Sequence, residues 1–271
     1  MMRTALLSVA AALSAAAAHA HGPQIQITND GSTIVTREVL NNHYSPLTDP
    51  KSAYVMPLLQ RPFQTPADAT WYTRAEASES VPGVPDFYSG PGIAFGVGLT
   101  FEVGSQTTLA FDGALQLWDG SAFSLADENW LEAFRGDPAT PSVTAKSGTT
   151  ESIAFSPIPS LGSGHGAYNE QSHATVRYRL GSTTPLAEPA DGVYLATLTV
   201  TNAAAGGATV SSEPFRFVMS KNAPVSELRA AVWSLGLAPG AVQWVAVPEP
   251  ASGALAAAAL LALGGLRRRK A

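Results

Sequence analysis

Hydrophobic residues alternate with small or polar residues along several stretches of the chain. The clearest stretch runs from Ile93 to Val103, and shorter ones follow at 174–180, 193–201 and 215–219. A period of two places every second side chain on the same face of a strand, so these stretches predict half-buried strands. Gly and Pro residues lie between them. Many short strands with such turns predict an all-β body, an antiparallel β-sandwich or jelly roll.

Three other stretches predict local elements. Residues 24–35 predict a hairpin, because apolar residues alternate with polar ones around the turn sequence Asn29-Asp30-Gly31. Residues 126–134 predict one short helix with two acidic residues in its first turn. Residues 221–240 predict a second short helix from apolar residues at helical spacing, namely Leu228, Val232 and Leu235.

The first twenty residues have the pattern of a secretory signal peptide. Arg3 precedes an apolar run from Ala5 to Ala18, and small residues follow. The sequence Ala18-His19-Ala20 fits cleavage by signal peptidase before His21, whereas cleavage after Ala18 leaves His19 first. The chain has no cysteine. An exported body of this composition therefore forms no disulfides and depends on its own hydrophobic core.

The C-terminal residues 247–271 combine three parts in order. Pro248 and Pro250 block helix formation and hold Glu249 in an extended segment. An uncharged run, Ala251 to Leu266, follows; as a transmembrane helix it spans about 24 Å, short of a hydrocarbon core of about 30 Å. Four cations end the chain: Arg267, Arg268, Arg269 and Lys270. They extend the span by snorkelling and set its orientation. A plain membrane anchor and an Ala-rich helix are the alternatives.

This arrangement resembles the PEP-CTERM sorting signal of Gram-negative bacteria. The resemblance rests on Pro248, Glu249 and Pro250, on the apolar run, and on the final cluster with Arg267, Arg268 and Arg269. It implies an exosortase-type transpeptidase that cuts near the proline-flanked glutamate. It also implies delivery to the cell envelope, the cell surface or the extracellular space, and an association with extracellular polysaccharide.

The net charge of the body is more negative than that of the whole chain. The chain has 16 basic and 21 acidic residues; without Arg3 and the four terminal cations, 11 basic residues remain, which gives a net charge of −10. Nucleic-acid binding needs a basic surface, so the composition argues against a nucleic-acid partner. An acidic surface is compatible with cation binding and equally with simple solubility.

Histidines are the strongest candidates for chemistry in the body. His165 lies in a Gly-rich loop and His173 directly precedes a predicted strand, so both can reach one rim of the sheet. Neutral imidazole nitrogens suit zinc. Loop histidines hydrated by water are the alternative. His21, as a new N-terminus, offers an amine and an imidazole to copper, and His43 is the remaining histidine of the body.

A second resemblance concerns the closing strands. The segments 173–178, 191–196 and 212–218, together with Trp118-Asp119-Gly120, are similar to a PEP-CTERM subgroup controlled by the zinc-uptake repressor and to other surface-anchored β-domain proteins. Those proteins usually place His-x-His before the first of these strands. This chain has Gln171-Ser172-His173 there, so His165 is the candidate for the second ligand. The resemblance implies zinc capture rather than catalysis.

We therefore expect a non-enzymatic exported β protein with a surface-structural or ligand-binding role. Its expected parts are a signal peptide (1–20), a β body (21–222), a linker with a possible short helix (223–246) and the sorting tail (247–271). The alternative is a secreted carbohydrate-active or copper-dependent enzyme. Its carboxylates would come from Asp86, Asp112, Asp119 and Asp127. Its sugar-stacking aromatics would come from Trp71, Tyr72, Trp118 and Trp130.

Overall fold

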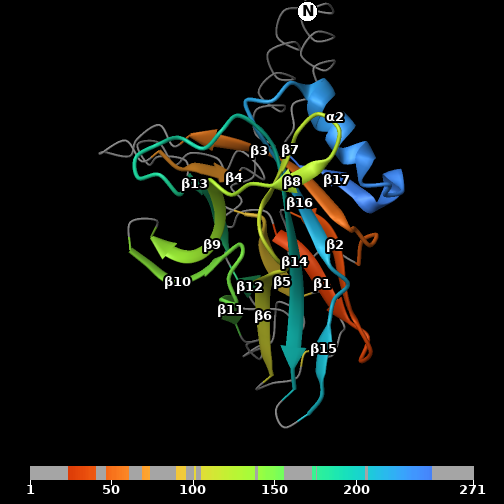
Figure 1. Cartoon of the computed structure of the whole chain (residues 1–271). Coiled ribbons are helices and arrows are strands. Elements are labelled where there is room, and N and C mark those ends of the chain that lie inside the picture. Colours follow the sequence, from red (N-terminus) through yellow and green to blue (C-terminus); the bar gives the residue numbers. More distant parts are fainter. Residues whose placement is uncertain are drawn as a thin grey trace, which may run out of the picture.

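The structure is a computed structural model, and strands dominate the part of the chain that it describes (Figure 1). It describes residues 24–40, 47–60, 69–73, 90–95, 101, 105–137, 140–155, 173–174, 176–204 and 207–245. The expected all-β class is confirmed over these residues. The predicted signal segment and the predicted sorting tail lie outside them. No helix among the described residues has the length and the apolar composition needed to cross a bilayer.

A small sheet of four strands contains the predicted N-terminal hairpin. Its order is β12 (His173–Ala174), β5 (Gly92–Phe95), β1 (Gln24–Asn29) and β2 (Ile34–Leu40). β1 and β2 are antiparallel, and β1 runs parallel to β5. The turn between β1 and β2 is closed by Asp30, whose carboxylate accepts hydrogen bonds from the backbone N–H groups of Ser32 and Thr33, both at 2.8 Å. The hairpin prediction is thus confirmed, because a short turn with local side-chain bonds sets its register.

A larger sheet forms the rest of the body. Its main path is β10 (Thr140–Lys146), β9 (Asn129–Asp137), β13 (Arg177–Ser182), β4 (Trp71–Thr73), β3 (Ala53–Gln60), β16 (Phe215–Lys221), β14 (Gly192–Ala203), β6 (Gln106–Phe111) and β11 (Ser152–Phe155). Four short strands pair beside this path: β7 (Gln116–Trp118), β8 (Phe123–Leu125), β15 (Thr209–Ser211) and β17 (Val242–Trp244). The predicted strands at 174–180, 193–201 and 215–219 are therefore present in this sheet, apart from Ala174 in β12, the undescribed Thr175, and Val176, which precedes β13.

Two sets of apolar side chains bury the two faces of the central strands. One face contributes to the main core, where Tyr54, Phe217 and Tyr194 pack in the same cluster as Ile25 and Ile27 of the small sheet. The Tyr54 and Phe217 rings meet edge to face, with centroids 6.0 Å apart. The core thus joins the two sheets. Such strands alternate in side-chain direction without alternating in polarity, because both of their faces are covered.

The opposite face of β3, β14 and β16 is covered by helix α2 (Val225–Ser234). Leu228, Ala231 and Val232 of this helix pack with Val55 and Val218. The helix predicted within residues 221–240 is therefore confirmed. A short 3-10 helix, η1 (Pro239–Ala241), and then β17 follow it. β17 lies parallel to β3, so the segment that we expected as a linker adds a strand to the sheet.

The helix predicted at residues 126–134 is wrong. Residues 129–137 form β9, which pairs with β10 on one side and with β13 on the other. Leu131 and Ala133 are fully buried in the core, whereas Trp130 and Glu132 point to the other face. Buried and less buried residues alternate here with the period of a strand. Pairing with β10 and β13 outweighs the weak helix preference of the acidic residues before β9.

Candidate functional site at the C-terminal junction

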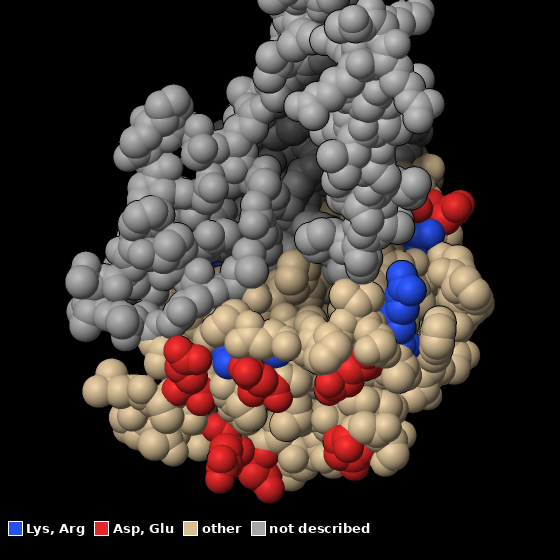
Figure 2. All heavy atoms as spheres, turned by 90° about the horizontal axis from the view of Figure 1, so that it is seen from above, with Lys and Arg blue, Asp and Glu red and all other residues tan. Residues whose placement is uncertain are grey.

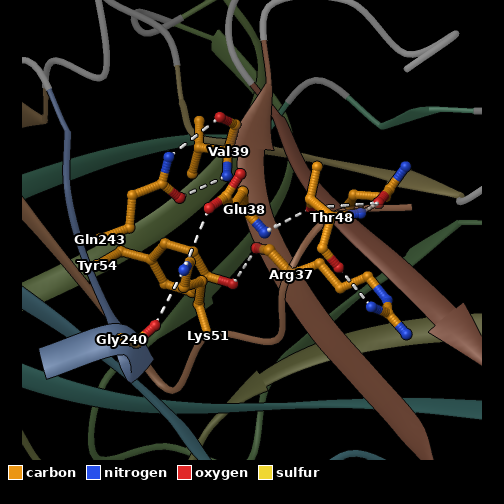
Figure 3. A network of polar contacts seen from close by, with 9 residues as sticks. Arg37, Glu38, Val39, Thr48, Lys51, Tyr54, Gly240 and Gln243 are labelled. Carbon is orange, nitrogen blue, oxygen red and sulfur yellow. Dashed lines mark hydrogen bonds and ion pairs between the residues drawn. The ribbon is translucent and has the colours of Figure 1, made fainter. Parts of the chain in front are cut away.

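A network of polar contacts fixes the segment that leads into the predicted tail. We call it the C-terminal junction. It consists of η1, β17 and the residues that hold them, and Figure 3 shows its side chains converging from β2, β3 and the segment before β3. The labelled members are Arg37, Glu38, Val39, Thr48, Lys51, Tyr54, Gly240 and Gln243. Strand β2 near the beginning of the described chain therefore meets its last strand, β17, here.

Gln243 forms a bridge between the two sheets. Its side-chain oxygen accepts a hydrogen bond from the Val39 N–H at 2.6 Å, and its side-chain nitrogen donates to the Val39 carbonyl at 3.1 Å. The amide thus satisfies both backbone groups of one residue in β2, as a paired strand does. β2 ends the order of the small sheet, and capping an edge in this way removes a site for unwanted strand pairing. The neighbouring strand positions, Val242 and Trp244, point to the other face of β17.

Lys51 connects the same region to η1. Its ammonium group donates to the Gly240 carbonyl at 2.9 Å and lies 3.1 Å from a carboxylate oxygen of Glu38. The Lys51 side chain is 9% exposed, so its charge is mostly removed from water and needs these two partners. Backbone bonds add to the attachment: Ser52 donates to the Ala241 carbonyl at 2.8 Å, and Val245 donates to the Val55 carbonyl at 2.7 Å.

Arg37 of β2 and Tyr54 of β3 complete the network. The Tyr54 hydroxyl donates to the Arg37 carbonyl at 2.5 Å, and burial raises the pKa of this hydroxyl, with the negative charge of Glu38 acting in the same direction. It therefore stays protonated as a donor at physiological pH. The Arg37 guanidinium donates to the Thr48 carbonyl and to the Thr28 hydroxyl. Every one of these groups is used inside the protein.

The residues of the C-terminal junction have a structural role: they hold η1 and β17 in place. Glu38 is the one carboxylate among the eight labelled residues, and none of the eight is a histidine. The set therefore lacks the paired carboxylates of a glycosidase. Its side-chain donors and acceptors are paired with backbone groups 10 to 204 positions away in the sequence. Such contacts fix the position at which the chain leaves the body.

A second buried charge lies at the far end of β16. Lys221 is 2% exposed, its ammonium group pairs with Asp191 and lies 3.6 Å from Glu188, and it stands 4.4 Å from the centroid of the Trp71 ring. The hydrogen bond from Lys221, followed by one from Asn222, lowers the pKa of the Asp191 carboxyl. The pair holds the end of β16 next to the start of β14, where Asp191-Gly192 begins the strand.

The predicted metal ligands are only partly within the described chain. His21, His43 and His165 lie outside the described residues, as do Pro248, Glu249, Pro250, Arg267, Arg268 and Arg269. His173 begins β12, where its backbone pairs with Ala94 of β5. Among the described residues, no group of three or more histidine, aspartate or glutamate side chains lies together as a metal site would require.

Three of the four carboxylates considered for an enzyme lie within the described residues. Asp119 closes the β7–β8 turn by accepting from the backbone N–H groups of Ser121 and Ala122, both at 2.8 Å, and these bonds lower the pKa of its carboxyl. Asp112 accepts from the Thr199 hydroxyl. Asp127 is exposed. Asp86 lies outside the described residues.

The proposed sugar-stacking aromatics are largely occupied by protein contacts. Trp71, Tyr72 and Trp118 are all less than 10% exposed. Trp130 is half-buried, packs against Gly181, and donates from its indole nitrogen to the Ser182 carbonyl at 2.9 Å. The Lys146 ammonium lies 4.6 Å from the centroid of its ring. These rings are therefore part of the packing of the sheet rather than a free stacking surface.

Sequence reasoning missed the junction residues. Gln243 between Val242 and Trp244 fits the strand period, which is the one local signal. Nothing in the sequence indicates that this side chain pairs with Val39, 204 positions away. Known proteins give no further guide, because no protein-family model matches the chain and no curated protein matches it either.

Proposed function

We propose that this chain is an exported, non-enzymatic surface protein that is sorted to the cell envelope by its C-terminal tail. The observation that carries the proposal is the order of parts: an apolar N-terminal run, a cysteine-free β body, Pro248-Glu249-Pro250, an apolar run and a basic end. Each part has a physical role in crossing a membrane, stopping in it and being released. The role of the body is surface-structural or ligand-binding.

The junction supports this proposal by giving the body a firm exit point. The described chain ends at Val245, whose amide is bonded to Val55, and the proline-flanked Glu249 lies only four positions further on. A transpeptidase of the exosortase type needs the body on one side of its cleavage site and the membrane run on the other. A clamped end keeps the folded body intact while an adjacent extended segment is held in an enzyme.

We further propose that the body is a β-sandwich of the jelly-roll kind. The shared core between the small sheet and the larger sheet supports this architecture, with Ile25 and Ile27 packing in the same cluster as Tyr54 and Phe217. Inward-facing apolar side chains from two sheets are what a sandwich requires. The acidic surface fits a soluble exported body, and Figure 2 shows acidic side chains spread over the described surface on the face that it presents.

If the body binds a ligand, we propose that this ligand is zinc, held by His165 and His173. Its support is the position of His173 in β12, which is the end strand of the small sheet. Native mass spectrometry of the full chain in detergent, with and without micromolar zinc, tests this proposal. We expect one retained ion, which His165→Ala and His173→Ala each remove. Retention of the ion in both variants contradicts the assignment of these ligands.

Sorting is tested by following the full chain in a Gram-negative host that has an exosortase-type transpeptidase and in a matched host that lacks it. We expect the first twenty residues to be absent in both hosts and the tail to be removed only in the first. The triple substitution Pro248→Ala, Glu249→Ala and Pro250→Ala should leave the tail attached and the protein in the inner membrane. Pro185→Ala, at an exposed proline outside the motif, is the matched control and should be processed normally. Recovery of the intact chain from the cytosol with residues 1–20 still attached overturns the proposal.

A further inference from the structure

A long uncharged surface segment precedes the predicted tail. From Ala230 to Pro248 the sequence contains no Asp, Glu, Lys or Arg, although the chain without Arg3 and the four terminal cations carries a net charge of −10. Within the described part of this segment, Trp233 is 74% exposed and Trp244 is 41% exposed. They are the two most exposed of the chain's five tryptophans, since Trp71 and Trp118 are buried and Trp130 is half-buried. Two exposed indoles in an uncharged segment, with the exposed Arg229 one helical turn before Trp233, point to an apolar or interfacial partner.

Trp233 belongs to α2, which covers the outer face of the sheet, and Trp244 belongs to β17, which adds a strand beside β3. α2 turns Leu228, Ala231 and Val232 toward the sheet and leaves Trp233 exposed. Trp244 lies on the same face of β17 as Val242, by strand alternation, and Val242 packs with the cluster beneath α2. The polar face of β17 is turned inward to Val39 through Gln243. The junction therefore fixes the direction in which Trp244 points.

The distance along the chain places this surface close to the membrane segment. Trp244 is seven positions before Ala251, where the uncharged apolar run begins. An extended chain covers at most about 3.6 Å per residue, so Trp244 lies within about 25 Å of the start of that run. Because Val245 is still bonded to the sheet, the part of the chain that is free to act as a spacer is shorter still.

We propose that the surface formed by Trp233, Trp244 and the other exposed residues of the uncharged segment 230–245 is a membrane-contacting face, which rests on the bilayer interface while the tail is inserted. This inference rests on the proposed function, because it takes the tail to be in the membrane. Tryptophan is enriched at membrane interfaces, where its ring is apolar and its N–H group remains hydrogen-bonded. The absence of acidic side chains from this segment removes repulsion by anionic lipids. The tail also keeps the surface at a high effective concentration near lipid, so weak contacts suffice.

Fluorescence quenching by lipid tests the proposal directly on the full chain. The protein is reconstituted into vesicles of phosphatidylethanolamine and phosphatidylglycerol, with and without bromine atoms on the acyl chains near the headgroup. We expect the brominated lipid to quench part of the tryptophan emission. We expect the quenching to be lost in the double variant Trp233→Phe and Trp244→Phe, because the other tryptophans are held within the body. Trp233→Phe and Trp244→Phe alone should each lose part of it.

A matched reporter at the other end of the body provides the control. Thr209 is exposed in β15, which pairs with the end of β14, whereas α2 packs against the beginning of β14 at Leu195. Ala203, the partner of Thr209, is eight positions from Leu195, or roughly 26 Å along the strand. Figure 1 shows β15 and α2 at opposite ends of the body. Thr209→Trp in the double variant should fluoresce without being quenched.

The outcomes separate this inference from the function on which it rests. If the chain floats with the vesicles but Trp233 and Trp244 are not quenched, the membrane-contacting face is wrong and the sorting proposal stands. If the chain does not float with the vesicles, the inserted tail is wrong as well. If Trp233 and Trp244 are shielded by a second copy, seen as a dimer by sedimentation in detergent that the double variant abolishes, the inference is overturned in favour of a protein interface.

Discussion

Gln243→Ala removes the side-chain bridge between β17 and β2 and so tests whether the C-terminal junction is fixed by it. The change removes two hydrogen bonds, one from the Val39 N–H and one to the Val39 carbonyl. Val39 is half-buried, so water replaces part of what is lost, and each bond contributes about 0.5–1 kcal/mol. The expected loss is therefore about 1–2 kcal/mol, or roughly a 5- to 30-fold change in an opening equilibrium.

The loss is expected as local opening of β17, because this strand is the last described element and its backbone pairs with one strand, β3. Native-state hydrogen exchange of the Val245 amide, which is bonded to the Val55 carbonyl, measures this opening. We expect exchange roughly 5- to 30-fold faster in Gln243→Ala. Gln106→Ala, at an exposed position of β6, should leave it unchanged. An unchanged rate in Gln243→Ala would show that the backbone pairing with β3 alone holds the junction, and the reasoning given for Gln243 would be refuted.

Two further predictions concern packing and charge in the body. A Cβ atom at Gly181 would lie 2.2 Å from the Trp130 ring, so Gly181→Ala should lower the free energy of unfolding by about 1–3 kcal/mol in a urea titration; Gly240→Ala, where nothing lies within 4 Å, should change it little. The pKa of Asp191 is lowered by Lys221, so this carboxylate stabilises the fold above its ordinary pKa and the contribution is lost as pH falls through the lowered value. The stability difference between wild type and Asp191→Asn should therefore shrink below about pH 4; a difference that stays constant from pH 7 to pH 2 contradicts the ion pair.

The elements that could be predicted from the sequence are those whose causes are local. The all-β class followed from period-two alternation, which needs only the identity of successive residues. The β1–β2 hairpin followed from Asn29-Asp30-Gly31, since the Asp30 carboxylate bonds to amides two and three positions away. Helix α2 followed from the spacing of Leu228 and Val232, both of which are buried against the sheet.

Strand β9 and the C-terminal junction could not be predicted in this way, because both depend on partners far along the chain. Residues 129–137 became β9 because two strands pair with them, although their first residues also suited a helix. The candidate site was not foreseen for the same reason: Lys51 meets Gly240 and Gln243 meets Val39 only once β17 lies beside β3. The sequence states which residues carry a charge or an amide. Long-range strand pairing decides which of them meet, because contact between distant segments depends on the whole fold and not on any local pattern.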